Sequence, residues 1–145
     1  MTFSSLRLCL FASAIINAGT ICPVGASQRP ACSVLPLAEI ETIVGNSLSI
    51  GRASSARPER DSTHSACGYN PKERVGRGLL FTLISAQGPK LAEAQSQARA
   101  DPMHIFGATA IKSGMFVSAR VISMKGFTTD MAMSERVLAA ALRHL

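Results

Sequence analysis

The sequence predicts an α+β domain, with an antiparallel sheet of about four to five strands, helices packed on one face, and one disulfide. Apolar residues recur at helical spacing near both ends of the mature chain and alternate at strand spacing between them. The strand-like segments cluster between the helices without regular βαβ alternation, which favours antiparallel pairing. Two cysteines, Cys32 and Cys67, remain after the predicted loss of the N-terminal segment.

Residues 1–26 have the features of a signal peptide. Arg7 is followed by a short apolar run and then by small residues. The run is shorter than the roughly 20 apolar residues that cross a bilayer, so we expect no transmembrane segment in the mature chain. Cleavage can follow Ala18 or Ala26. We favour Ala26, which leaves residues 27–145 as a single small α+β domain.

The same segment bears on location and on the cysteine count. Cys22 is a candidate lipid anchor, but lipoproteins carry a small residue before that cysteine, and here the residue is Ile21. Lipid anchoring at Cys22 is therefore not expected. Cleavage after Ala26 leaves an even pair of cysteines, whereas cleavage after Ala18 leaves Cys22 as an odd thiol. The predicted location is periplasmic or secreted, where disulfides form.

A disulfide between Cys32 and Cys67 would close a loop of about 35 residues and stabilise the fold by roughly 3–4 kcal/mol. That is a large share of the 5–15 kcal/mol that is typical, to an order of magnitude, of a whole domain. The alternative is two buried reduced thiols, if export fails. The chain has no Cys-x-x-Cys spacing, so a redox-active pair is not expected.

The first helix is predicted from its apolar spacing and from its end signals. Leu37, Ile40 and Val44 recur at helical spacing. Pro36 suits the first turn, where its missing N–H costs nothing, and Gly45 supplies the stop. The apolar stripe of this helix needs a sheet to cover.

A weak strand and a polar segment follow the helix. Leu48 and Ile50 alternate with serines, which predicts the strand. Residues 54–66 are polar and lack apolar periodicity, so we predict a surface loop there. This segment and its flanks form a candidate binding loop, whose residues are Arg52, Arg57, Arg60 and His64.

The central strand is the clearest of the predicted strands. A short strand start at residues 67–69 precedes it. Residues 76–85 alternate so that Leu79, Phe81 and Leu83 share one side, which predicts a well-buried strand.

The last third is predicted to contain a helix, a hairpin and a final helix. Residues 91–100 are rich in Ala, Gln and Glu and are helical by propensity. Residues 104–126 predict a hairpin that turns at Lys112–Gly114. Thr128, Thr129 and Asp130 are all N-cap types of residue before the predicted helix Met131–Leu145.

Composition argues against nucleic acid as a partner. The chain has no Trp and one Tyr, so it lacks the rows of aromatic side chains on which single strands stack. The net charge is +6 at pH 7 and falls by one with the loss of Arg7. Six basic residues lie between Arg52 and Arg77, but Glu59, Asp61 and Glu73 are interspersed, which predicts a solvated surface.

Catalytic, cofactor and metal residues are not predicted. The three histidines are isolated in sequence, and the one metal-like spacing, His64 with Cys67, uses a cysteine that we assign to the predicted disulfide. No serine lies in a Gly-x-Ser-x-Gly turn. Gly76 and Gly78 lack the further glycine and the helix start of a phosphate-binding loop.

One pattern resembles a family of small exported bacterial proteins and lipoproteins of unknown function. It comprises Cys32 with Glu39 in CSVLPLAEI, then Gly45, then Cys67 and Tyr69 in CGY. The family pattern is Cys-x-Leu-Leu-Thr-x-x-Glu, a glycine that ends the helix, and Cys-x-Tyr. Here a proline replaces the threonine, and no lipobox is present. The resemblance implies an α+β domain with the disulfide and brings no catalytic residue.

These observations support one leading hypothesis and two alternatives. The leading one is a non-enzymatic exported module that binds an envelope partner or a small ligand. The first alternative is a small hydrolase-type enzyme whose site is dispersed in sequence; a cleft that brings His64 or His104 together with a carboxylate and a serine would favour it. The second is an anion-surface binder that uses the Arg52–Arg77 segment.

Overall fold

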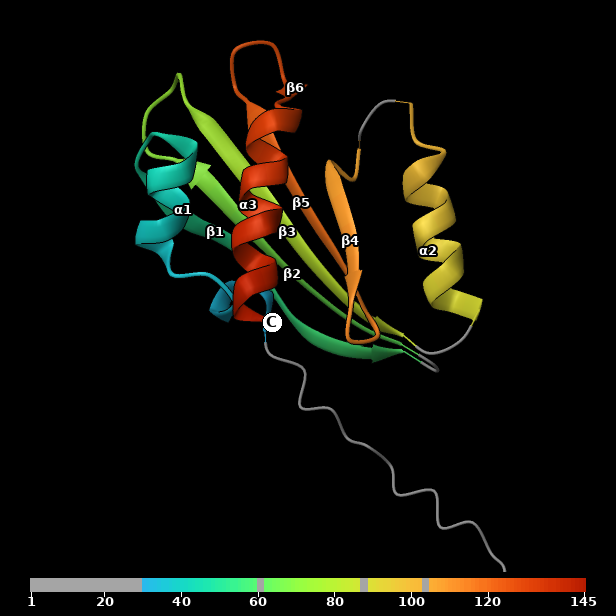
Figure 1. The fold of residues 1–145 in the computed structure, drawn as a ribbon. Coiled ribbons are helices and arrows are strands. Elements are labelled where there is room, and N and C mark those ends of the chain that lie inside the picture. Colours follow the sequence, from blue (N-terminus) through green and yellow to red (C-terminus); the bar gives the residue numbers. More distant parts are fainter. Residues whose placement is uncertain (1–29, 60–61, 87–88, 103–104) are drawn as a thin grey trace, which may run out of the picture.

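The computed structural model of the protein describes residues 30–59, 62–86, 89–102 and 105–145 (Figure 1). The predicted signal peptide with its two cleavage sites, Cys22, Arg60 and His104 lie outside these residues. In chain order the elements are η1 (Ala31–Ser33), α1 (Leu37–Val44), β1 (Leu48–Glu59), β2 (Ser62–Pro71), β3 (Arg77–Ala86), α2 (Pro89–Arg99), β4 (Ala108–Lys112), β5 (Met115–Ser123), β6 (Thr128–Thr129) and α3 (Met131–His144).

The strands form one antiparallel sheet in the order β1-β2-β3-β5-β4, and β6 pairs with β5 off this path. The predicted α+β class and the predicted order of helices and strands are confirmed, with the short elements η1 and β6 added. The sheet has six strands because β6 contributes two residues beside the end of β5.

The main core lies between the sheet and the two helices α1 and α3, which Figure 1 shows on the near face of the sheet. Ile40 and Val44 of α1 and Val137 of α3 are fully buried there. They pack with Phe81 of β3 and Val121 of β5, which alternation in the strands directs to the same face. The predicted buried side of this strand, with Leu79, Phe81 and Leu83, therefore faces the main core.

Helix α2 lies against the opposite face. Ile84 and Ala86 alternate along β3 with the core residue Leu83, so they point away from the main core, and they line a pocket together with side chains of α2. Phe116, the cross-strand neighbour of Ile84, is 1% exposed and is not part of the main core. The helices thus cover both faces, with α1 and α3 on one and α2 on the other. The prediction that the helices pack on one face is therefore wrong for α2.

The predicted surface loop at residues 54–66 is wrong. β1 continues to Glu59 and pairs with β2, with Ser54 opposite Ala66 and Arg57 opposite His64. The predicted binding loop is therefore a hairpin of two strands. Backbone pairing holds this hairpin, and two register shifts in β1 interrupt the side-chain alternation by which a sequence reveals a strand.

The signals at helix ends and turns are confirmed. Gly45 adopts a left-handed conformation with φ of 80° and ends α1, and Pro36 is the N-cap residue just before its first turn. Asp130 is the N-cap of α3. Ser113 and Gly114 both have positive φ, as a two-residue hairpin turn requires. None of the helices in the described part of the chain combines the length and apolar character that a bilayer crossing needs.

Candidate functional site

Cys32 and Cys67 form the predicted disulfide, with their Cα atoms 5.1 Å apart. The bond ties η1 to the centre of β2 on the core side of the sheet. The backbone N–H of Ala31, which is fully buried, donates to Oγ of Ser65 at 2.8 Å beside it. This pair of cysteines is a structural site that anchors the start of the domain.

A pocket of about 240 Å³ lies on the other face, between α2 and the strands β2 and β3. Clefts that hold drug-sized molecules have roughly 300–1,000 Å³, so this volume suits a smaller ligand. Its apolar lining comes from Ile84, Ala86 and Ala94. Its polar lining comes from Ser62 and His64 of β2 and from Lys90, Glu93 and Gln97 of α2.

Ser62 and His64 are two residues apart on β2, so both side chains point to the same face of the sheet. The Oγ atom of Ser62 lies 3.1 Å from Nε2 of His64, within hydrogen-bond distance. Ser62 is buried and His64 is half-buried. Arg52 and His64 are the residues of the predicted binding loop whose side chains the structure describes, and of these two His64 lines the pocket.

Helix α2 supplies the charged side of the pocket, which sequence reasoning missed. Lys90, Glu93 and Gln97 are spaced by three and four residues and therefore share one face of the helix. The Nε2 atom of Gln97 donates to Oε1 of Glu93 at 3.3 Å. The sequence shows that these polar residues and Ala94 share one face of a helix. It does not show which strand that face packs against.

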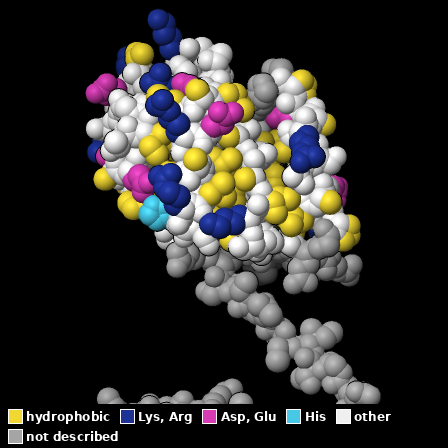
Figure 2. All heavy atoms as spheres, viewed as in Figure 1, with side chains coloured by type: hydrophobic (Ala, Val, Ile, Leu, Met, Phe, Trp, Pro, Cys, Tyr) yellow, Lys and Arg dark blue, Asp and Glu magenta, His cyan; other side chains and the backbone are white. Residues whose placement is uncertain are grey.

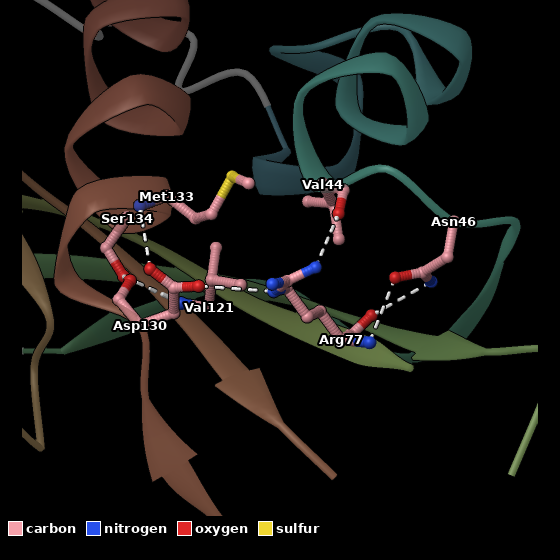
Figure 3. Close-up of polar contacts among 7 residues, drawn as sticks. All are labelled: Val44, Asn46, Arg77, Val121, Asp130, Met133 and Ser134. Atoms are coloured by element: carbon pink, nitrogen blue, oxygen red, sulfur yellow. Dashed lines mark hydrogen bonds and ion pairs between the residues drawn. The ribbon is translucent and has the colours of Figure 1, made fainter. Parts of the chain in front are cut away.

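Asp130 and Arg77 belong to a second polar cluster, which joins α1, β3 and α3 (Figure 3). Nε of Arg77 donates to Oδ2 of Asp130 at 3.1 Å, and the Arg77 guanidinium also reaches the carbonyl of Val44 at the end of α1. Asn46 bonds both backbone groups of Arg77. The contacts of this cluster hold helix ends to the sheet, so Arg77 has a structural role.

The described cations among the rest of the Arg52–Arg77 segment are spread along the sheet. Lys72 and Arg74 are exposed in the turn after β2. Arg52 is exposed on the edge strand β1, where the next residue, Ala53, pairs with Cys67, five residues before Lys72 and so about 16 Å away along the strand. The backbone of Arg57 pairs with that of His64, farther still from the turn.

Among the described residues, no group of three or more His, Cys, Asp and Glu side chains is placed to hold a metal ion. No protein-family model, no curated protein and no solved structure matches the chain. The family resemblance of the Cys32 to Tyr69 pattern thus stays a prediction.

Proposed function

We propose that this protein is an exported, non-enzymatic binding module that holds a small polar molecule in the pocket between α2 and the sheet. The pocket itself carries the proposal, because one cavity gathers a cation, an anion and neutral hydrogen-bonding groups over an apolar floor. Export is inferred from the N-terminal sequence, and the disulfide is compatible with it.

The lining indicates the chemistry of the ligand. Lys90 and Glu93 can bind groups of opposite charge, and Ser62 and Gln97 can both donate and accept hydrogen bonds. A small molecule that carries both donors and acceptors, such as a zwitterion, satisfies this set. The small volume and the two charges argue against an apolar ligand or an extended peptide.

Ala94 allows a direct test, because it lines the pocket while Ala92, on the same helix, is exposed and does not. Thermal unfolding of residues 27–145 would be followed against a panel of small zwitterions and other polar metabolites. At about 100 times the dissociation constant a bound ligand stabilises the fold by about 2.7 kcal/mol, which raises the Tm by several degrees.

The substitution Ala94→Phe should abolish this rise, and Ala92→Phe should retain it. A ligand whose stabilisation survives Ala94→Phe binds elsewhere, and that result would contradict the proposal.

The Ser62–His64 contact favours one second candidate, a small hydrolase. The pocket brings His64 together with a carboxylate, Glu93, and with a serine. In such a reaction Ser62 Oγ would attack an ester carbonyl carbon, its proton would pass to His64 Nε2 and then to the leaving alcohol, and water would release the acid by the reverse sequence.

A fluorophosphonate probe tests this candidate, because it labels activated serines. Labelling of Ser62 that disappears in His64→Ala would support the hydrolase, with Ser85→Ala as a control on the neighbouring strand. An unlabelled Ser62 would exclude it.

A further inference from the structure

We propose that the end of the sheet remote from the pocket docks on an anionic lipid bilayer through two neighbouring turns. The turns are residues 72–76, between β2 and β3, and residues 124–127, between β5 and β6; together we call them the tip surface. The pocket is lined by Ser62, the first residue of β2, and by Ala86, the last residue of β3, at the end of these strands away from the two turns. The tip surface is therefore independent of the proposed ligand site.

The two turns form one surface because the structure fastens them to each other. The backbone N–H of Met124 donates to the carbonyl of Gly76 at 2.9 Å. The terminal carbon of Met124 also lies close over Gly78, at a spot where a side chain on that residue would collide with it. Figure 1 shows both turns projecting from the top of the sheet, beyond the ends of α1 and α3.

Two large apolar side chains on these turns are left in solvent. Val75 is 71% exposed and Phe127 is 76% exposed, more than any other large hydrophobic residue in the described part of the chain. Phe127 also has a φ of 53°, in the left-handed region that bulky residues rarely adopt. Burial within the domain does not explain an aromatic residue at this position, whereas a partner outside the domain would.

Basic residues lie close in sequence to the two apolar ones on both turns. Lys72, Arg74 and Lys125 are exposed, and Glu73 is the acidic residue on these turns. Figure 2 shows Lys or Arg side chains (dark blue) beside hydrophobic ones (yellow) at the upper end of the molecule, over the β2–β3 turn. The neighbouring Arg77 and Asp130 neutralise each other. The tip surface thus carries an excess of positive charge.

An anionic bilayer matches this combination better than a protein partner does. Apolar side chains enter the boundary between headgroups and acyl chains, while anionic headgroups attract Lys and Arg. A stable protein interface buries about 800 Å² on each partner, and it needs a broad complementary face. Two projecting turns that each expose one large apolar side chain offer no such face, but a fluid bilayer adapts to them.

Vesicle sedimentation tests the proposal. Residues 27–145 would be mixed with vesicles of phosphatidylcholine and phosphatidylglycerol in equal amounts, or with phosphatidylcholine alone. We expect binding to the mixed vesicles, and weaker binding at high salt because the electrostatic part is screened. At low ionic strength, Lys72→Gln and Arg74→Gln should each weaken binding about fivefold, in line with the attraction of one basic residue to an anionic surface.

A second set of variants tests the apolar contribution to vesicle binding. Phe127→Ser should weaken binding at every salt concentration, whereas Ile111→Ser, which changes an exposed apolar residue at the other end of the sheet, should not. Circular dichroism and Tm would check that each variant is folded. Equal binding to both vesicle types, an unchanged Phe127→Ser variant, or no binding by the unmodified protein would overturn the proposal. The Ala94→Phe variant should still bind vesicles, which separates this test from that of the pocket.

Discussion

Asp130 makes several hydrogen bonds at the start of α3 through both its side chain and its backbone. Its Oδ1 atom accepts a hydrogen bond from the backbone N–H of Met133, and its Oδ2 atom pairs with Arg77. Its backbone carbonyl accepts from Oγ of Ser134, a fully buried hydroxyl that in turn accepts from the N–H of Val121. One residue thus caps the helix and helps to connect it to two strands.

The cap and the ion pair of Asp130 can be separated by two substitutions. Asp130→Ala removes both, and we expect it to lower the free energy of unfolding by about 1–2 kcal/mol. Asp130→Asn keeps an oxygen for the cap and loses the charge; it should cost less than about 1 kcal/mol, because Arg77 and Asp130 are both partly exposed to solvent. Urea unfolding measures both values. An Asp130→Asn variant as unstable as Asp130→Ala would show that the ion pair dominates.

Tyr69 reports on the core through its ionisation. Its side chain is 2% exposed, and desolvation by burial raises its pKa above the ordinary value of 10.0. The folded state therefore holds the proton of the Tyr69 hydroxyl more tightly than the unfolded state does. The contribution of this group to the free energy of unfolding is complete below pH 10 and is lost as the pH rises through and beyond that value.

The chain has one Tyr and no Trp, so absorbance at the tyrosinate band follows Tyr69 alone. In the native protein the band should appear above pH 10, and in urea it should appear at the ordinary value. A native titration that coincides with the one in urea would contradict the burial of Tyr69.

At the scale of elements, the sequence predicts well those segments in which apolar side chains recur at the spacing of a strand or a helix. Leu79, Phe81 and Leu83 alternate without interruption, and the strand β3 follows the pattern. Residues 54–59 have no apolar alternation, because two register shifts interrupt the side-chain order of β1. Pro58 also argues against a strand in the sequence, but β1 is an edge strand, where proline is tolerated. The pocket was not predictable either, because it depends on α2 folding back over His64, a contact distant in sequence.

The pairing of β1 with β2 predicts how the polar hairpin responds to proline. Ala66 lies in β2, between β1 and β3 in the sheet. Ala66→Pro therefore removes a ladder hydrogen bond from an inner strand, and it should destabilise the protein by about 1–3 kcal/mol because the former acceptor loses its donor. Glu73→Pro, in the exposed turn after β2, is the matched control and should change stability little. Urea unfolding measures both. A tolerated Ala66→Pro would mean that the segment is a loop after all.

Across the whole molecule, the two proposed sites lie at opposite ends of one sheet. The pocket lies at the start of β2 and the end of β3, and the tip surface joins the other ends of the same two strands. The strands β2 and β3, which pair with each other along their length, therefore run from one site to the other. A protein docked by its tip surface would hold the pocket at the end of the sheet that is remote from the bilayer.

The disulfide secures this arrangement from the core side, because Cys67 lies on β2 and its bond to Cys32 fixes η1 against the strand. The variant with both Cys32→Ser and Cys67→Ser should lose roughly 3–4 kcal/mol of the free energy of unfolding, mainly because its unfolded chain is less restricted. The unmodified protein in dithiothreitol should unfold at nearly the same urea concentration as this variant, and the variant should not respond to the reductant. If dithiothreitol leaves the unfolding midpoint of the unmodified protein unchanged, and its two thiols titrate as free, the bond does not form in the protein. The anchoring of η1 would then depend on the hydrogen bond from Ala31 to Ser65 and on packing alone.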